Sequence, residues 1–372
     1  MSNTQTNAVD RWEIRMRITA FIKRHPVSSF FALAFAYSWI WWGVLFVVAP
    51  KGFEAGRAEM GALALYGLFG ATGSSVASIV ITRVVDGRAG LRALFSRLGK
   101  WRVNFVGYAV AILVTPLLLT VILLALSFVV SPVFLPAVVT SSDIATLLGF
   151  GIIVGLVAGF FEELGWTGFA IPKLQIRYGA LATGLIVGVL WGVWHFLPDF
   201  WGRVGSFGAL YVPNYVVFVI GVVAYRILIV WVYNNSKGSL LLAVLMHASF
   251  SGSQAIFIPA LSVADWVLVQ VFFAAVLWLV VAVVVIVTGK RLVRESRLGL
   301  QGVSHWCVCA PADPHTPTAH EETRRQFSKW KNRLRLAFRV ACFSKVTGQR
   351  MDKRSQMLPS LLLVPSVFLS EV

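Results

Sequence analysis

Long apolar runs, each almost free of charged residues, follow one another through most of this chain. A helix of about 20 apolar residues is long enough to cross a hydrocarbon core of about 30 Å. The sequence therefore predicts an all-α fold, a polytopic membrane helix bundle with about eight transmembrane helices. The predicted spans lie at residues 28–50, 61–82, 104–130, 145–171, 180–199, 212–233, 239–259 and 265–288.

The composition supports a membrane protein. Only 13% of the residues are charged and 58% are apolar, whereas a soluble domain carries roughly 25% charged residues. No short apolar segment with a small-residue cleavage site opens the chain, so we expect the first run to be a retained span. The cysteines lie beyond the last run and match no zinc-ligand spacing; they are Cys307, Cys309 and Cys342.

The formal net charge of +17 would suit a nucleic-acid-binding protein, but the placement of the basic residues indicates a membrane topology. The loop at 83–103 carries six Lys and Arg, the loop at 131–144 carries none, and the tail opens with four between residues 290 and 297. Cytoplasmic loops are enriched in Lys and Arg. We therefore expect a multi-pass cell-membrane protein in the lipid bilayer, with both termini cytoplasmic and no nucleic-acid partner.

Three regions follow from this topology. Residues 1–27 form a basic cytoplasmic N-terminus, 28–290 the eight-span membrane domain, and 291–372 a basic C-terminal tail. The tail mixes prolines with charge clusters, and we expect it to be disordered. A basic helix on the inner leaflet is the alternative, because apolar residues recur there at helical spacing, namely Phe327, Trp330, Leu334 and Phe338.

Ionisable residues inside the apolar runs are the main functional candidates, because a charge in a membrane is costly. The fourth run contains Glu162 and Glu163, the fifth contains His195, and the seventh contains His247. Two adjacent carboxylates in apolar surroundings cannot both ionise cheaply, and such a group suits general acid–base catalysis. Two imidazoles nearby could ligate a metal, hold a water molecule or donate to a developing oxyanion. Together these groups predict a hydrolytic site.

Two ladders of glycine suggest how the helices meet. The ladders comprise Gly151, Gly155 and Gly159 before the glutamates, and Gly184, Gly188 and Gly192 before His195. Small residues at this spacing let helix backbones approach closely in lipid. We predict that the fourth and fifth spans pack against each other through these faces. Arg226, in the sixth run, could neutralise a glutamate or extend its guanidinium to the inner face, and the sequence leaves both alternatives open.

Residues 162–172 (EELGWTGFAIP) resemble the first motif of the CPBP family of intramembrane metalloproteases, which includes CAAX prenyl proteases and bacteriocin-processing, or Abi, proteins. Trp191 to His195 matches the second motif, an aromatic residue followed four residues later by histidine. His247 matches the histidine of the third motif. The likeness covers roughly residues 145–255.

The resemblance implies an eight-span fold with a peptidase site inside the membrane. Glu162, Glu163, His195 and His247 would form the catalytic set. Glu162 would be the main base, His195 would help to activate water, and His247 would polarise the scissile carbonyl or bind a metal. A divalent metal such as zinc, held by Glu162, His195 and His247, is one form of this chemistry, and metal-free glutamate catalysis is the other. The substrate would be a peptide or a membrane-protein segment.

Two positions depart from the family pattern. Thr167 stands where the first motif commonly has arginine, and an arginine four residues after Glu163 could pair with that carboxylate. Its absence favours a protonated Glu163 or a substitute role for Arg226. Ser251 stands where the third motif often has asparagine, and its hydroxyl can still donate one hydrogen bond. A lost oxyanion donor would weaken activity by about 10²–10³-fold.

Two other functions remain open. The first is a catalytically silent membrane scaffold, or a bacteriocin-immunity-type protein, that keeps the fold and binds a partner. The second is a proton-coupled transporter that uses the two glutamates, although such transporters usually show repeated halves and broken helices. The oligomeric state is not predicted.

Overall fold

The computed structural model describes residues 3–50 and 67–293. The first part of the second predicted span, at 61–66, lies outside these residues. Nearly all of the predicted C-terminal tail, with its aromatic residues and the three cysteines, also lies outside them.

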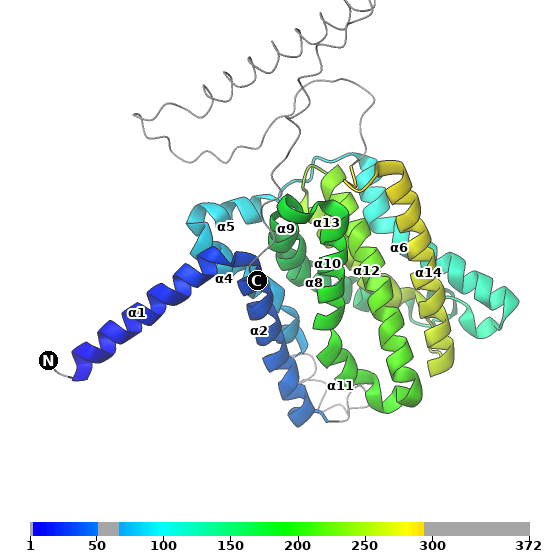
Figure 1. Ribbon diagram of the computed structural model, residues 1–372. Helices are drawn as coiled ribbons and strands as arrows, with labels where there is room; N and C mark the ends of the chain where they lie inside the picture. Colours follow the sequence, from blue (N-terminus) through cyan, green and yellow to red (C-terminus); the bar gives the residue numbers. More distant parts are fainter. Residues whose placement is uncertain (1–2, 51–66, 294–372) are drawn as a thin grey trace, which may run out of the picture. The chain divides into compact units, whose positions relative to one another are not determined.

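The described residues form helices and no strand, so the predicted all-α fold is confirmed (Figure 1). The elements are α1 (Asn3–Arg24), α2 (Pro26–Val48), α4 (Gly73–Val85), α5 (Gly87–Ser96), α6 (Phe105–Val129), η2 (Pro132–Phe134), α7 (Ala137–Thr140), α8 (Ile144–Gly165), η3 (Trp166–Ala170), α9 (Ile171–Tyr178), α10 (Ala180–Trp194), α11 (Phe196–Phe207), η4 (Gly208–Leu210), α12 (Tyr211–Asn235), α13 (Leu240–Phe257) and α14 (Val263–Thr288).

Six helical segments of the described chain are long and apolar enough to cross a membrane. They are Pro26–Val48, Phe105–Val129, Ile144–Tyr178, Phe196–Asn235, Leu240–Phe257 and Val263–Thr288. Two shorter apolar helices, α4 and α10, occupy the second and fifth predicted spans. The predicted polytopic helix bundle is therefore confirmed, with two of its helices shorter than a full span.

The fifth predicted span does not continue to residue 199, because α10 ends at Trp194. Pro198 lies four residues further on and has no N–H to donate to the Trp194 carbonyl, so it interrupts the helix. The freed Trp194 carbonyl accepts a hydrogen bond from Trp39 Nε1 at 3.0 Å. His195 is thus the residue between α10 and α11, and the chain turns into α11 where a loop was predicted.

A second irregular segment follows the glutamates. α8 passes into a π-helical turn, η3, before α9 continues to Tyr178. Pro172 cannot donate to the Gly168 carbonyl, and that carbonyl accepts a hydrogen bond from Arg97 Nη1 at 2.8 Å instead. Single π-helical turns occur frequently at functional sites, and this one directly follows Glu162 and Glu163.

The glycine ladders meet different partners from those predicted. The ladder on α8 faces α13, since an added Cβ on Gly155 would lie 2.3 Å from the Ala248 carbonyl oxygen. The ladder on α10 faces α12, where a Cβ on Gly188 would lie 2.8 Å from Val223 Cα. The prediction that spans four and five pack on each other through these faces is wrong. Small residues permit close approach by any helix and do not select one.

The contact between α8 and α13 can be tested with a glycine pair on α8. Gly155→Ala should lower the stability of the protein by about 1–3 kcal/mol, because the added methyl group forces the two backbones apart. Gly149→Ala is the matched control, since nothing lies within 4 Å of a Cβ at that position. Thermal unfolding in detergent should show a lower midpoint for Gly155→Ala alone, and equal midpoints for the two variants would contradict the close contact.

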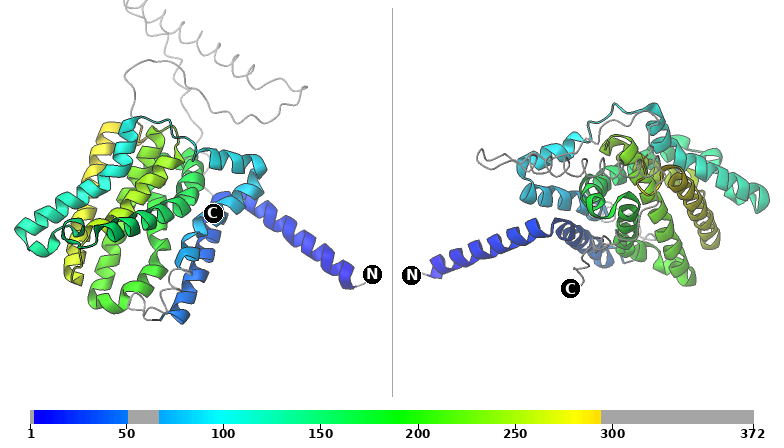
Figure 2. Two further views of the ribbon diagram at one scale, coloured as in Figure 1. Left: turned by 180° about the vertical axis from the view of Figure 1, so that it is seen from behind. Right: turned by 45° about the horizontal axis from the view of Figure 1, so that its top comes forward.

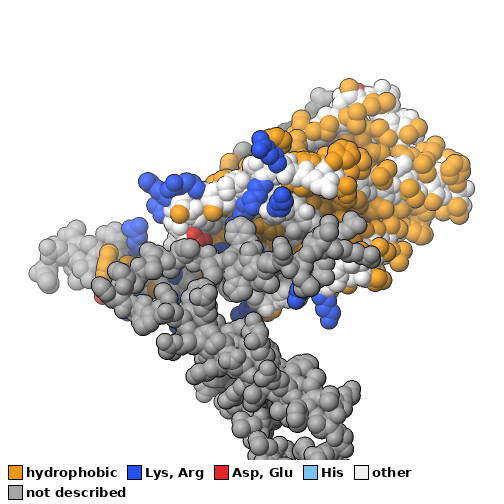
Figure 3. All heavy atoms as spheres, turned by 90° about the horizontal axis from the view of Figure 1, so that it is seen from above, with side chains coloured by type: hydrophobic (Ala, Val, Ile, Leu, Met, Phe, Trp, Pro, Cys, Tyr) orange, Lys and Arg blue, Asp and Glu red, His pale blue; other side chains and the backbone are white. Residues whose placement is uncertain are grey.

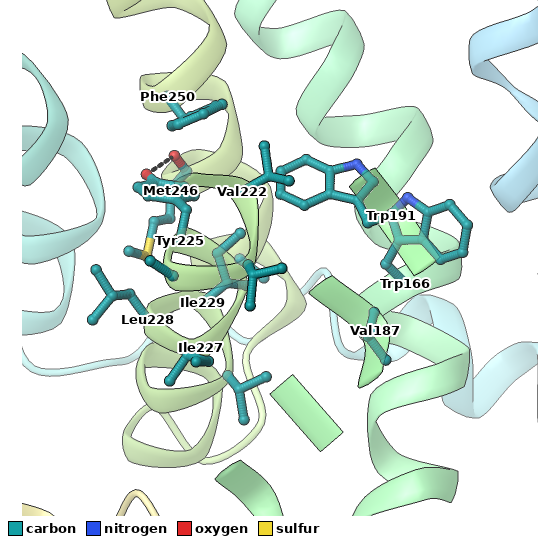
Figure 4. Packing of buried hydrophobic residues seen from close by; sticks show 14 of the residues in the cluster. Trp166, Val187, Trp191, Val222, Tyr225, Ile227, Leu228, Ile229, Met246 and Phe250 are labelled. Carbon is teal, nitrogen blue, oxygen red and sulfur yellow. Dashed lines mark hydrogen bonds between the residues drawn. The ribbon is translucent and has the colours of Figure 1, made fainter. Parts of the chain in front are cut away.

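α12 lies among the other helices of the bundle and is buried along most of its second half. Figure 4 shows its side chains Tyr225, Ile227, Leu228 and Ile229 beside Met246 of α13. The Tyr225 hydroxyl donates a hydrogen bond to the Met246 carbonyl at 2.7 Å. This contact fixes α12 against the helix that carries His247.

Candidate active site

Glu163 lies at the centre of a buried polar cluster and is fully buried. Its Oε2 atom accepts a hydrogen bond from Arg226 Nη1 at 2.7 Å and another from the Thr167 hydroxyl. Its Oε1 atom lies 2.7 Å from His247 Nδ1. Because a carboxylate buried in a membrane needs compensating partners, these three side chains from three helical elements hold Glu163 in place.

Arg226 pairs with Glu163 and does not extend to the membrane surface. Its side chain is fully buried, and its Cζ atom lies 4.2 Å from the centre of the Trp191 ring. The face of an indole ring attracts a cation, so Trp191 provides a second partner for the guanidinium. Arg226 thus supplies the cation for Glu163 that Thr167 cannot supply, and Thr167 joins the same network.

Glu162 has different partners from Glu163, although the two are neighbours in the sequence. Its Oε2 atom accepts a hydrogen bond from Trp191 Nε1 at 2.6 Å. Its Oε1 atom lies 4.0 Å from His195 Nε2 and 4.0 Å from His247 Nε2. The carboxylate of Glu162 therefore faces both imidazoles, while that of Glu163 faces Arg226.

The contacts of the two histidines indicate which ring nitrogens carry protons. His195 Nδ1 lies 2.9 Å from the Trp191 carbonyl oxygen, which can only accept, so Nδ1 is the donor. In the neutral ring this leaves the lone pair of His195 on Nε2, facing Glu162. His247 Nδ1 donates to the Glu163 carboxylate in the same way, so its Nε2 also faces Glu162.

The spacing of these atoms can be compared with the geometries of a bound water molecule and of a zinc ion. Ligands of a tetrahedral zinc at about 2.0–2.1 Å stand about 3.3 Å from one another. Two groups that hydrogen-bond one water at about 2.8 Å can stand about 4 Å apart. The 4.0 Å separations at Glu162 match the water geometry. Within residues 3–50 and 67–293, no group of three or more His, Cys, Asp and Glu side chains is placed to hold a metal ion.

A cavity of about 510 Å³ gives access to this site. Glu162, His195 and His247 line it, and so does Ser251, one helical turn after His247. Glu163, Thr167 and Arg226 do not line it. The predicted site residues therefore form two groups. The first group faces the cavity, and the second lies behind it, away from the cavity.

Sequence reasoning missed several polar residues of the cavity. Asp199 lines it and forms an ion pair with Arg203, and Asn214 and Gln254 line it as well. Trp191 was recognised as part of a motif but not as a partner of Glu162. The costly placement of a charged residue in an apolar segment was the signal that could have identified Asp199.

Comparisons with known proteins match the part of the chain that carries this site. Residues 144–253 match the family described as type II CAAX prenyl endopeptidase Rce1-like. The chain is also similar to the CAAX prenyl protease 2 of Methanococcus maripaludis, with 31% identity over 97 residues. That stretch is 25% of this chain and 35% of the relative, so only about a third of the relative's length is matched. The predicted resemblance to the CPBP family of intramembrane proteases is therefore confirmed for the region that carries the site.

Proposed function

We propose that this protein is an intramembrane endopeptidase that hydrolyses peptide bonds with a glutamate–histidine site. The observation that supports this most directly is the position of Glu162 Oε1, which lies 4.0 Å from the Nε2 atoms of both His195 and His247 inside the cavity. The match to a prenyl endopeptidase family over the same residues also supports it.

In the proposed reaction, a water molecule is held between Glu162 Oε1 and His195 Nε2. Glu162 takes one proton from this water as the water oxygen attacks the carbonyl carbon of the scissile bond. The attack forms a tetrahedral intermediate in which the former carbonyl oxygen carries the negative charge. When the intermediate collapses, the C–N bond breaks and Glu162 gives the proton to the amine. The products are a carboxylic acid, which keeps the second water proton and then passes it to the amine, and an amine, and Glu162 returns to its starting state.

His247 is the proposed partner of the oxyanion. Its Nδ1 donates to the Glu163 carboxylate, which fixes the ring with Nε2 toward the cavity, and an Nε2–H would donate to the oxyanion. Ser251 lines the cavity on the same helix and supplies a further hydroxyl donor. Hydrogen-bond donors that point at the developing negative charge lower the energy of the transition state.

The experiment that tests this function uses the purified protein in liposomes. The probes are an internally quenched CAAX peptide with a farnesyl group, the same peptide without it, and a quenched peptide library. His195→Ala and His247→Ala should each reduce the cleavage rate by about 10²-fold or more, with unchanged yield of folded protein. If no probe is cleaved and both variants complement a deletion strain as well as the unmutated protein, the scaffold function replaces the peptidase.

Metal dependence is a separate arm of this experiment. The separations at Glu162 favour catalysis by water without a metal, so elemental analysis should find no stoichiometric zinc and a chelator should leave cleavage unchanged. Zinc bound at one equivalent, with activity lost to the chelator and restored by zinc, would show that Glu162, His195 and His247 move together to ligate it.

Trp191 is proposed as a positioning residue for Glu162. Trp191→Phe keeps an aromatic ring but removes the N–H that donates to Glu162 Oε2. A hydrogen bond to a charged group contributes about 1.5–3 kcal/mol, so kcat should fall about tenfold or more, with little change in KM. Trp194→Phe is the control, because Trp194 Nε1 has no acceptor among the described residues. Equal kcat values for the two variants would contradict the proposal that Trp191 positions Glu162.

A further inference from the structure

The cavity extends from the site toward one end of the bundle. On α13 its lining residues follow His247, from Ser251 through Gln254 to Ile258 at the C-cap of the helix. On α12 it is lined by the first half of the helix, beginning with Asn214, and on α14 by Trp266 near the helix start. We call this end, with α11 and the α13–α14 connection, the mouth end; the label α11 marks it in Figure 1, and Figure 2 shows the bundle from two further sides.

The bundle is closed in the opposite direction. On α12 and α13, and on η3 and the start of α9 after the glutamates, most residues between the site and the other end are buried. Examples are Trp166 of η3 and Ile171 of α9, which follow the glutamates, Ile227 and Ile229 after Arg226 on α12, and Leu242 and Ala243 before His247 on α13. Figure 4 shows this closely filled region around Ile227 and Ile229. Among the described residues, the lining of the cavity does not extend to this side.

The closed end carries most of the described basic residues. Hydrogen bonds join its connections to one another, from Lys100 Nζ to the Lys237 carbonyl at 3.0 Å and from Leu181 N to the Lys290 carbonyl at 3.2 Å. Figure 3 looks onto this end and shows Lys and Arg side chains gathered on it. Besides Lys100, Lys237 and Lys290, the basic residues of this end are Arg83, Arg88, Arg92, Arg97, Arg102, Lys173, Arg177 and Arg291.

The mouth end differs sharply in charge. Among the described residues its basic side chain is Arg203, and that side chain is paired with Asp199. On the same side of the predicted topology, the connection at 131–144 has no Lys or Arg, and the connection at 51–60 balances Lys51 and Arg57 with Glu54 and Glu59. Because Lys and Arg in short loops mark the cytoplasmic side of a membrane protein, the closed end lies in the cytoplasm and the mouth end lies on the opposite side.

We infer that the catalytic cavity opens to the extracytoplasmic face, and that its substrate is a polypeptide segment displayed on that face; the peptide nature of the ligand rests on the proposed function. The lining supports access from water as well. Asn214, Gln254 and Gln270 line the cavity between the mouth and the site, and hydrolysis consumes a water molecule at every turnover. A peptide and its water would both reach Glu162 from outside the cell.

Cysteine accessibility in intact cells tests this orientation without requiring activity. The native cysteines, Cys307, Cys309 and Cys342, are first replaced by serine in the full-length chain. Ala255→Cys then reports the cavity, because Ala255 lines it, and Ser96→Cys reports the closed end, because Ser96 is exposed at the end of α5. The probe is a membrane-impermeant maleimide, applied to whole cells and to inside-out vesicles.

We expect the maleimide to label Ala255→Cys in whole cells and Ser96→Cys only in inside-out vesicles. Gln254→Cys is a second cavity reporter if the first variant does not fold. Labelling of the cavity cysteine only in inside-out vesicles, or in neither preparation, would overturn the inference. Correct labelling combined with a failure to cleave any peptide would leave the orientation intact and count against the proposed function alone.

Discussion

Replacing Glu162 by glutamine is expected to reduce peptide cleavage by about 10²–10⁴-fold, the usual contribution of a general base. Glutamine has nearly the same shape, and its amide oxygen can still accept the N–H of Trp191, which now lies 2.6 Å from Glu162 Oε2. It cannot take a proton from water. The loss should therefore appear in kcat, while thermal stability and peptide affinity change little. Cleavage rates of the quenched peptides in liposomes measure the effect.

Asp86→Asn provides the matched control for this prediction. Asp86 is also a carboxylate, but it lies between α4 and α5 at the closed end, where it pairs with Lys173 at 3.3 Å. Its neutralisation should leave the cleavage rate unchanged. A Glu162→Gln protein that cleaves as fast as the Asp86→Asn protein would show that Glu162 is not the base, and the catalytic assignment would then have to move to another group.

The second large effect concerns the stability of the fold. Arg226→Met should lower the free energy of unfolding by about 3–5 kcal/mol, because it leaves the carboxylate of Glu163 buried without its cation. Both side chains of the pair are fully buried, and they meet at 2.7 Å. Methionine fills much of the volume of arginine but carries no charge. Unfolding in mixed detergent micelles, followed by a spectroscopic signal, measures the difference.

Two further variants serve as controls for the Arg226→Met measurement. Lys173→Met breaks an ion pair whose side chains are partly exposed, so it should cost no more than about 1 kcal/mol. The double variant Arg226→Met with Glu163→Gln should regain most of the lost stability, since no unpaired charge remains. If Arg226→Met is no less stable than Lys173→Met, the buried pair is not ionic and Glu163 carries a proton.

The central residues of the site could be predicted from the sequence because a membrane penalises ionisable groups so strongly. Glu162, His195 and His247 stood out in apolar runs, and all three face one cavity. The role of Arg226 was one of two open alternatives, since a sequence does not show whether a long basic side chain turns inward or toward the lipid surface. Its contact with Glu163 depends on how α8 and α12 are placed.

The partners of the helices could not be predicted in the same way. The glycine ladder through Gly155 correctly marked a close-contact face, but the face belongs to α13 rather than α10. Backbone irregularities were also hidden in the apolar pattern. Pro198 ends α10 beside His195, and Pro172 follows the π-helical turn η3. Each proline alters the hydrogen bonding of one carbonyl, a local effect that hydropathy does not register.

The most direct test of the proposed chemistry is peptide cleavage in water labelled with heavy oxygen. When a water molecule activated by Glu162 attacks the peptide carbonyl directly, one labelled oxygen enters the new carboxylate of the N-terminal fragment. Mass spectrometry of the fragments from the purified protein should show this label after a single turnover, and the Glu162→Gln protein should yield no labelled fragment in the same time. Fragments without the label, or labelled fragments formed equally fast by Glu162→Gln, would contradict hydrolysis at this site.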